Sequence, residues 1–293
     1  MSSQSILTRA SGLARRLRWL TLRRVGIGIL YLALTAGAIL ALLPFAWMIS
    51  TSLKRLPEAF RWPIQWLPDW PVWQNYVTVF SYVPFLRFYG NTAFVAVART
   101  LGVLLTSCMA GYAFARLRFP GRDAIFLIYL GTMMIPDQVT LIPRFVTMRL
   151  FHWIDTYQAL IVPGLFSAFG AFLMRQFLMS IPRSLDDAAI IDGADHLGIF
   201  WRISLPLSKP AIATLIIFAF VGSWNDFLWP LVIINSVEKL VLSVGLAHFQ
   251  DLYYTEWTLL MAASVMAMVP VVLIYLFAQR YFVQGIALTG VKG

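Results

Sequence analysis

The chain alternates between six long apolar stretches and the polar segments that join them. Each stretch holds about 20 residues or more, the length that an α-helix needs to cross about 30 Å of hydrocarbon. The pattern therefore predicts an all-α polytopic membrane protein with six transmembrane helices. They are expected at roughly Val25–Ile49, Asn91–Ala115, Ala124–Pro143, Tyr157–Met179, Ala211–Ile234 and Trp257–Phe282. The third and fifth stretches also carry proline and polar residues.

The composition agrees with a membrane protein and argues against several kinds of site. Hydrophobic residues make up 60% of the 293 residues and charged residues 12%, about half the charged fraction of an ordinary soluble domain. The single cysteine, Cys108, lies inside an apolar stretch, and the three histidines show no metal-ligand spacing. No Gly-x-x-x-x-Gly-Lys-Ser/Thr loop occurs either. We therefore expect no catalytic, cofactor or metal site on this chain, and a transport protein rather than an enzyme.

The distribution of basic residues predicts the orientation in the membrane. Six arginines precede the first stretch, with no acidic residue among them. With the N-terminus inside, 15 of the 23 lysines and arginines fall on the cytoplasmic side and seven on the outer side. Cytoplasmic segments are enriched in basic residues, so both termini are expected there. We expect a basic N-terminus (1–24), a transmembrane domain (25–283) and a short cytoplasmic tail (284–293). The first stretch is too long for the apolar core of a cleavable signal peptide.

A polar segment of small residues, Ser184–Pro206, separates the fourth and fifth stretches on the predicted cytoplasmic side. Ser184 and Asp187 have the spacing of a capping box, which predicts that a helix starts there. Gly193 can form a bend because it has no Cβ, and Asp195 can cap a second short helix that Pro206 stops. This helix–bend–helix would suit a surface on which another protein docks. An ordinary solvated loop is the alternative.

Within this segment, Asp187-Ala188-Ala189, Asp192-Gly193-Ala194, Phe200, Ile203 and Leu205-Pro206 resemble the coupling signature of ABC importer permeases. The family pattern runs Glu-Ala-Ala, three residues, Gly, then Ile-x-Leu-Pro. Asp187 departs from it, because its carboxylate sits one methylene group closer to the backbone than that of the family's Glu. The resemblance extends over nearly the whole chain from the first stretch onward. It is strongest to the carbohydrate-uptake branch, with its maltose-type and glycerol-3-phosphate-type permeases.

The resemblance implies a type I importer fold with a cytoplasmic coupling helix, in a bacterial or archaeal cytoplasmic membrane. Such a chain forms half of a translocation pathway with a second, related permease, and no nucleic acid is involved. Two ATP-binding subunits, which bind ATP and Mg, dock inside, and a solute-binding protein docks outside. The solute would be a sugar or a sugar-like molecule. The residues that match the coupling signature are Asp187, Ala188, Ala189, Asp192, Gly193, Ala194, Leu205 and Pro206.

Polar residues inside the apolar stretches are candidates for lining the pathway. A charge at such depth costs about 2.5–3.5 kcal/mol and usually faces a cavity or a partner. The candidates are Arg99, Met133, Met134, Asp137, Trp224, Asn225 and Asp226. In the alternative reading they satisfy one another, for example Arg99 with Asp226 or with Asp137. Pro136 removes a backbone donor from the third stretch and predicts a kink there. Arg99 also hints at an anionic solute.

Two segments on the predicted outer side are rich in aromatic residues. Between Lys54 and Tyr89, four tryptophans lie among prolines, which favours anchoring at the lipid headgroups over direct stacking on a sugar. In the last outer loop, Ser236–Glu256, the candidates for contact with the binding protein are His248, Phe249 and Tyr253. A plain connector is the alternative for that loop.

A different class of function is an ion-coupled secondary transporter of a small polar solute, with Asp226 or Asp137 as its proton or sodium site. It would need neither partners nor a cytoplasmic docking segment. A membrane-embedded enzyme is disfavoured, because no nucleophile and base are paired in the sequence.

Overall fold

The computed structural model describes residues 3–250 and 254–289, and the regular secondary structure of these residues is helical. The long helices are α1 (Ser3–Ser52), α4 (Phe85–Arg116), α5 (Arg122–Gly131), α6 (Asp137–Leu150), α8 (Ala168–Ser180), α12 (Lys209–Trp224) and α15 (Trp257–Thr289). Shorter helices and turns join them: α2 (Leu56–Ala59), α3 (Gln74–Tyr82), η1 (Thr132–Met134), α7 (Tyr157–Ile161), η2 (Val162–Gly164), α9 (Ser184–Ile191), α10 (His196–Ile199), η3 (Phe200–Ser204), α11 (Leu205–Leu207), α13 (Leu228–Ile233), η4 (Val237–Lys239), α14 (Leu242–Leu246) and η5 (Ala247–Phe249).

Four helical segments of the described chain are long and apolar enough to cross a membrane. They are Arg24–Ser52, Phe85–Arg116, Tyr157–Ser180 and Trp257–Phe277, and they coincide with the first, second, fourth and sixth predicted spans. Two further segments pass the same test only as bent pairs, Arg122–Met134 with Asp137–Leu150 and His196–Leu207 with Lys209–Trp224. Counting each bent pair as one span gives six.

The two predicted spans that contain proline and polar residues are not continuous helices. In the third, the helix axis turns by 100° at Ile135–Pro136, much more than the kink that the sequence predicts. In the fifth, α12 ends at Trp224 and α13 starts at Leu228, so the expected single helix over 211–234 is wrong. Polar side chains at 225 and 226 and the lack of an N–H at Pro230 explain the break, because they weaken the helix on both sides.

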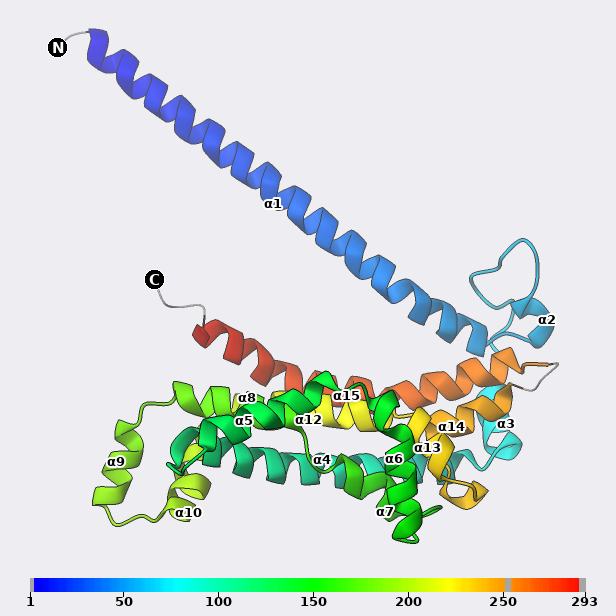
Figure 1. Ribbon diagram of the computed structural model, residues 1–293. Coiled ribbons are helices and arrows are strands. Elements are labelled where there is room, and N and C mark those ends of the chain that lie inside the picture. Colours follow the sequence, from blue (N-terminus) through cyan, green and yellow to red (C-terminus); the bar gives the residue numbers. More distant parts are fainter. Residues whose placement is uncertain (1–2, 251–253, 290–293) are drawn as a thin grey trace.

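Helix α4 is the centre of the bundle. It packs most extensively on α8 and next on α12, while α15 packs on α12 and on the C-terminal end of α1 (Figure 1). Helix α1 then diverges from the rest, and its most apolar part has no buried residue, as expected for a lipid-facing span (Figure 1). Two buried clusters form the core. One surrounds Trp229 and Phe249 near α3 and α14, and the other surrounds Met174 and Phe200 near α10.

The predicted limits of the transmembrane domain, residues 25 and 283, both fall inside continuous helices, α1 and α15. The end of the predicted tail, residues 290–293, lies outside the described residues.

Candidate functional site

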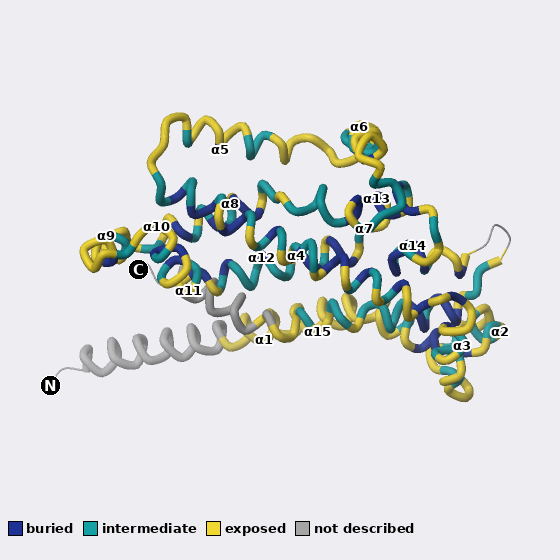
Figure 2. Tube along the Cα trace, turned by 90° about the horizontal axis from the view of Figure 1, so that it is seen from below, coloured by how far each residue is buried: buried dark blue, intermediate teal, exposed yellow. Residues whose placement is uncertain are grey.

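The segment that resembles the coupling signature projects from one end of the bundle as a bent pair of short helices, α9 and α10 (Figure 2). Gly193 forms the bend with φ at +82°, a left-handed conformation that is rare for residues with a Cβ. Asp195 caps α10, because its Oδ1 accepts a hydrogen bond of 2.8 Å from the Gly198 N–H. Both features are as predicted from the sequence.

Two details of the predicted segment are wrong. Ser184 is the first helical residue rather than the cap, Arg183 takes the cap position, and no side chain accepts a bond there. The second helix does not stop at Pro206 but continues through η3 and α11 to Leu207. Pro206 lies near the end of this helical run, and only Leu207 follows it before the run ends. The chain instead turns by 78° between α11 and α12, at Ser208.

Buried polar contacts fasten the segment to α4. The Asp186 carboxylate lies 3.2 Å from Nε of Arg116, and both side chains are largely buried. The Tyr112 hydroxyl donates a hydrogen bond of 3.2 Å to the carbonyl of His196. Ala189 packs into the core, so the predicted small-residue face of the segment is only partly available to another protein. These contacts attach the segment to α4.

The outward side of the segment is apolar and acidic. Ile190, Ile191 and Leu197 are exposed, with Ile191 at 86%. Of the residues that match the coupling signature, Asp187, Ala188, Asp192, Gly193 and Pro206 are exposed, whereas Ala194 and Leu205 are half-buried. Exposed apolar side chains beside carboxylates at a projecting tip are typical of a surface that another protein covers.

Deeper in the bundle, Arg99 and Asp226 form an ion pair, with Nη1 of Arg99 2.7 Å from Oδ2 of Asp226. This is the pairing that the sequence analysis left as an alternative. Gly164 leaves the room for it, because a Cβ at this position would collide with the Arg99 guanidinium. Since Arg99 is neutralised within the chain, it no longer indicates an anionic solute.

The ion pair lines a cavity of about 510 Å³, which we call the polar cavity. Asp137 lines it as well, so three of the seven candidate pathway residues meet there. Trp224 and Asn225 instead line a second, largely apolar cavity next to α15, and the Trp224 Nε1 donates to the carbonyl of Ala267. The candidates Met133 and Met134 are exposed and are not among the residues that line the polar cavity.

Two residues of the polar cavity were missed by sequence reasoning. The Arg144 guanidinium lies 4.3 Å above the Trp229 ring, and the Trp229 Nε1 donates a hydrogen bond of 2.8 Å to the carbonyl of Ala159. Ser223 is 7% exposed, and its hydroxyl has no hydrogen-bond partner among the described residues. The sequence gives one signal for such a site: Arg144 directly follows the third apolar stretch, a position that also suits an ordinary loop charge.

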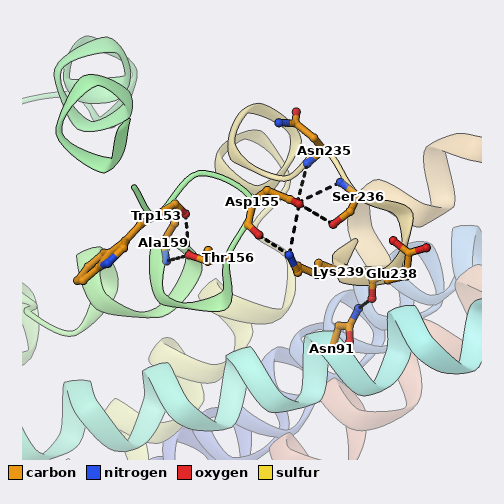
Figure 3. Close-up of polar contacts among 9 residues, drawn as sticks. All are labelled: Asn91, Trp153, Asp155, Thr156, Ala159, Asn235, Ser236, Glu238 and Lys239. Atoms are coloured by element: carbon orange, nitrogen blue, oxygen red, sulfur yellow. Dashed lines mark hydrogen bonds and ion pairs between the residues drawn. The ribbon is translucent and has the colours of Figure 1, made fainter. Parts of the chain in front are cut away.

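At the end of the bundle opposite the projecting segment, Asp155 joins the loop before α7 to the loop after α13 (Figure 3). Its carboxylate accepts hydrogen bonds from the backbone N–H groups of Asn235 and Ser236, from the Ser236 hydroxyl and from the Lys239 ammonium. Burial alone would raise the pKa of Asp155, but these hydrogen bonds outweigh it and lower the pKa to about 2. Asn91 of α4 strengthens the same region by donating to the carbonyls of Glu238 and Leu240.

We expect Asp155→Asn to destabilise the protein by about 2 kcal/mol at pH 7, because the folded state holds the carboxylate ionised. Since the pKa is lowered on folding, this contribution is complete above about pH 4 and disappears as the pH falls through about 2. Thermal unfolding of the purified protein in detergent, measured across this pH range, checks the prediction. Asp69→Asn, which removes an exposed ion pair with Arg61, is the control. Equal melting temperatures of wild type and Asp155→Asn at pH 7 would contradict it.

The aromatic candidates of the outer segments differ in exposure. Trp62, Trp66, Trp70 and Trp73 are all exposed, as expected of side chains at the lipid headgroups. His248 is exposed too, whereas Phe249 is 1% exposed and stacks on Tyr82, so it is not part of an outer surface. Tyr253 lies outside the described residues.

A family model described as "Binding-protein-dependent transport system inner membrane component" matches residues 91–288, about two thirds of the chain. The chain belongs to this family. It is therefore a permease subunit, a multi-pass inner-membrane component of an ABC importer, and not itself an enzyme. The residues that the family model matches, 91–288, include the projecting segment and the residues that line the polar cavity.

Similar proteins match this permease over most of the length of both chains. It is 36% identical to the arabinooligosaccharides transport system permease protein AraQ of Halalkalibacterium halodurans, over 87% of this chain and 93% of the relative. It is 32% identical to the sn-glycerol-3-phosphate transport system permease protein UgpE of Yersinia pestis, over 87% and 94%. A chain from a bacterial ABC transporter involved in the import of the acidic polysaccharide alginate superposes with a TM-score of 0.79, at 28% identity over 89% of this chain and 97% of that chain.

Proposed function

We propose that this permease carries a carbohydrate, or a closely related polyhydroxylated solute, that an extracytoplasmic binding protein delivers. The relatives named above are transport-system permeases for arabinooligosaccharides and for sn-glycerol 3-phosphate. The similar solved structure is that of an ABC transporter involved in the import of the acidic polysaccharide alginate. The observation that carries the proposal is that the chain belongs to a family of binding-protein-dependent transporters along residues 91–288.

The functional transporter, in this proposal, contains a second, related permease and two ATPase subunits. The two permeases enclose the pathway between them, and the ATPases bind ATP and Mg. The projecting segment formed by α9 and α10 docks on an ATPase, and Asp187, Ala188, Asp192 and Gly193 lie at the contact. The exposed apolar residues and carboxylates of this segment support that assignment.

ATP-driven closure of the ATPases would move the projecting segment as a lever. The Asp186–Arg116 ion pair and the Tyr112–His196 hydrogen bond tie the segment to α4, so a displacement of the segment displaces the bundle. Rigid-body rocking then switches the pathway between inward-open and outward-open states, because ATP binds the closed ATPase dimer more tightly.

The proposed topology has six spans, with α5 and α6 together as the third, α12 and α13 together as the fifth, and both termini in the cytoplasm. The excess of lysine and arginine on that side supports it. The projecting segment and the ATPases then share the compartment that contains ATP, while α2, α3 and the Asp155 contacts face the binding protein.

The test is to purify the tagged permease together with its partner subunits and to measure uptake into proteoliposomes. Uptake is expected to require ATP and to persist when an uncoupler collapses ion gradients. Asp187→Lys is expected to reduce ATPase recovery about tenfold, because charge reversal at an interface costs several times the thermal energy. Glu238→Lys, at the opposite end, is the control. Uptake without ATP that an uncoupler abolishes would establish a secondary transporter and overturn the proposal.

A further inference from the structure

We infer that the polar cavity is a solute-binding site of this subunit, shaped for a neutral polyhydroxylated solute and not for an anionic one. The inference rests on the proposed function and specifies its substrate class. With a volume of about 510 Å³, the polar cavity is within the range of pockets that bind small molecules.

The polar cavity lies where three helical spans are interrupted. Asp137 begins α6 just after the 100° bend, Gly164 lies in the η2 turn between α7 and α8, and Asp226 lies in the gap between α12 and α13. Irregular backbone at membrane depth is tolerated where it faces a cavity, and discontinuous helices commonly form the substrate sites of transporters. Three interruptions that converge on one cavity are therefore evidence for a binding site rather than a packing defect.

The charges around the polar cavity balance. It is lined by two arginines, Arg99 and Arg144, and two carboxylates, Asp137 and Asp226. Arg99 is already bound to Asp226 at 2.7 Å, and Arg144 lies on the Trp229 ring. An anionic solute could bind Arg99 only by displacing the Asp226 carboxylate, and beside Arg144 it would share the cavity with the carboxylates of Asp137 and Asp226. A neutral solute faces dipoles and incurs no such cost.

The walls of the polar cavity match the chemistry of a sugar. Phe166 is 69% exposed, and Phe169 and Phe218 contact each other edge to face with centroids 5.4 Å apart. Such rings pack on the apolar faces of a sugar ring. Ser223 also lines the polar cavity, and its buried hydroxyl has no hydrogen-bond partner among the described residues, although a buried polar group is normally satisfied.

The experiment uses the assembled transporter in lipid nanodiscs without its binding protein, so that only the permease can select the solute. Cys108, which is buried, is first replaced by alanine. A single cysteine is then introduced either by Phe166→Cys, in the lining of the polar cavity, or by Phe172→Cys, at a residue that does not line the cavity. The rate of modification by an uncharged thiol reagent is measured with a mixture of neutral oligosaccharides, with sn-glycerol 3-phosphate, and with neither.

The neutral oligosaccharides are expected to slow labelling at position 166 about fivefold, as for a largely occluded pocket, without slowing it at position 172. Glycerol phosphate is expected to slow neither. Protection by glycerol phosphate, protection at both positions, or no protection by the oligosaccharides would each overturn the inference. These outcomes would leave the proposed function intact. Failure of the proposed function would show in a different experiment, as an absence of ATP-dependent uptake by proteoliposomes with the wild-type transporter.

A second pair of variants keeps the inference testable if the cysteine variants assemble poorly. Phe169 and Phe172 lie on the same helix, α8, and are 36% and 37% exposed, but only Phe169 lines the polar cavity. Phe169→Ala is expected to raise the KM of uptake about fivefold, since an aromatic contact contributes on the order of 1 kcal/mol. Phe172→Ala is expected to leave KM unchanged. Equal effects of the two substitutions would overturn the inference.

Discussion

Replacing Gly193 with valine is expected to abolish ATP-dependent uptake while leaving the permease in the membrane. Gly193 has φ at +82°, and a β-branched residue is strongly disfavoured in this left-handed region. Nothing lies within 4 Å of the position that a Cβ would occupy, so valine meets no steric obstacle within the chain. Its effect would therefore come from a changed angle between α9 and α10, or from collision with the docked ATPase. Uptake into proteoliposomes and membrane content by immunoblot are the two measurements.

Two control variants separate these causes. Gly121→Val introduces the same backbone strain, since Gly121 has φ at +75°, but it lies in the bend before α5 and is not part of the signature. Gly193→Asn keeps the bend, because asparagine tolerates the left-handed region, while it adds a side chain. If the bend alone matters, asparagine should retain most of the uptake; if an ATPase must approach the backbone closely, asparagine should also fail. Unimpaired uptake by Gly193→Val would refute the coupling role.

Features that depend on short stretches of sequence could be predicted. Four spans follow from hydropathy alone, because about 20 consecutive apolar residues are long enough to cross the bilayer and can satisfy their backbone hydrogen bonds there as a helix. The Gly193 bend and the Asp195 cap follow from the local conformational preferences of those residues. The break at Pro136 was also visible as a kink, although its 100° angle was not, because the angle depends on what α6 packs against.

Features that depend on distant residues could not be predicted. Arg99 and Asp226 are 127 residues apart, so their ion pair was one alternative among several until helix positions were known. The same applies to Arg116 with Asp186, which fastens the projecting segment. Phe249 illustrates the opposite error. An aromatic residue in a polar loop suggested an exposed contact, yet it packs against Tyr82 in the core.

The second large effect is expected at Gly111, where α4 and α8 pack closely. A Cβ at this position would lie 2.5 Å from the Cβ of Met174 and 3.0 Å from the backbone nitrogen of Arg175. Membrane helices often use small residues for such close contacts, and their backbones cannot yield as a flexible side chain can. Gly111→Leu is therefore expected to force α4 and α8 apart and to destabilise the fold by at least about 3 kcal/mol.

We expect Gly111→Leu to leave little folded permease in the membrane, and the remainder to melt well below wild type in detergent. Gly90→Leu is the matched control, because Gly90 is in the same helix and has nothing within 4 Å of the Cβ position. If close packing of α4 on α8 holds the bundle together, only Gly111→Leu should reduce the folded yield. Transmission from the projecting segment would suffer with it, since Arg116 lies on the same helix five residues further on and pairs with Asp186. Wild-type yield and melting temperature for Gly111→Leu would show instead that the two helices can separate without loss of the fold.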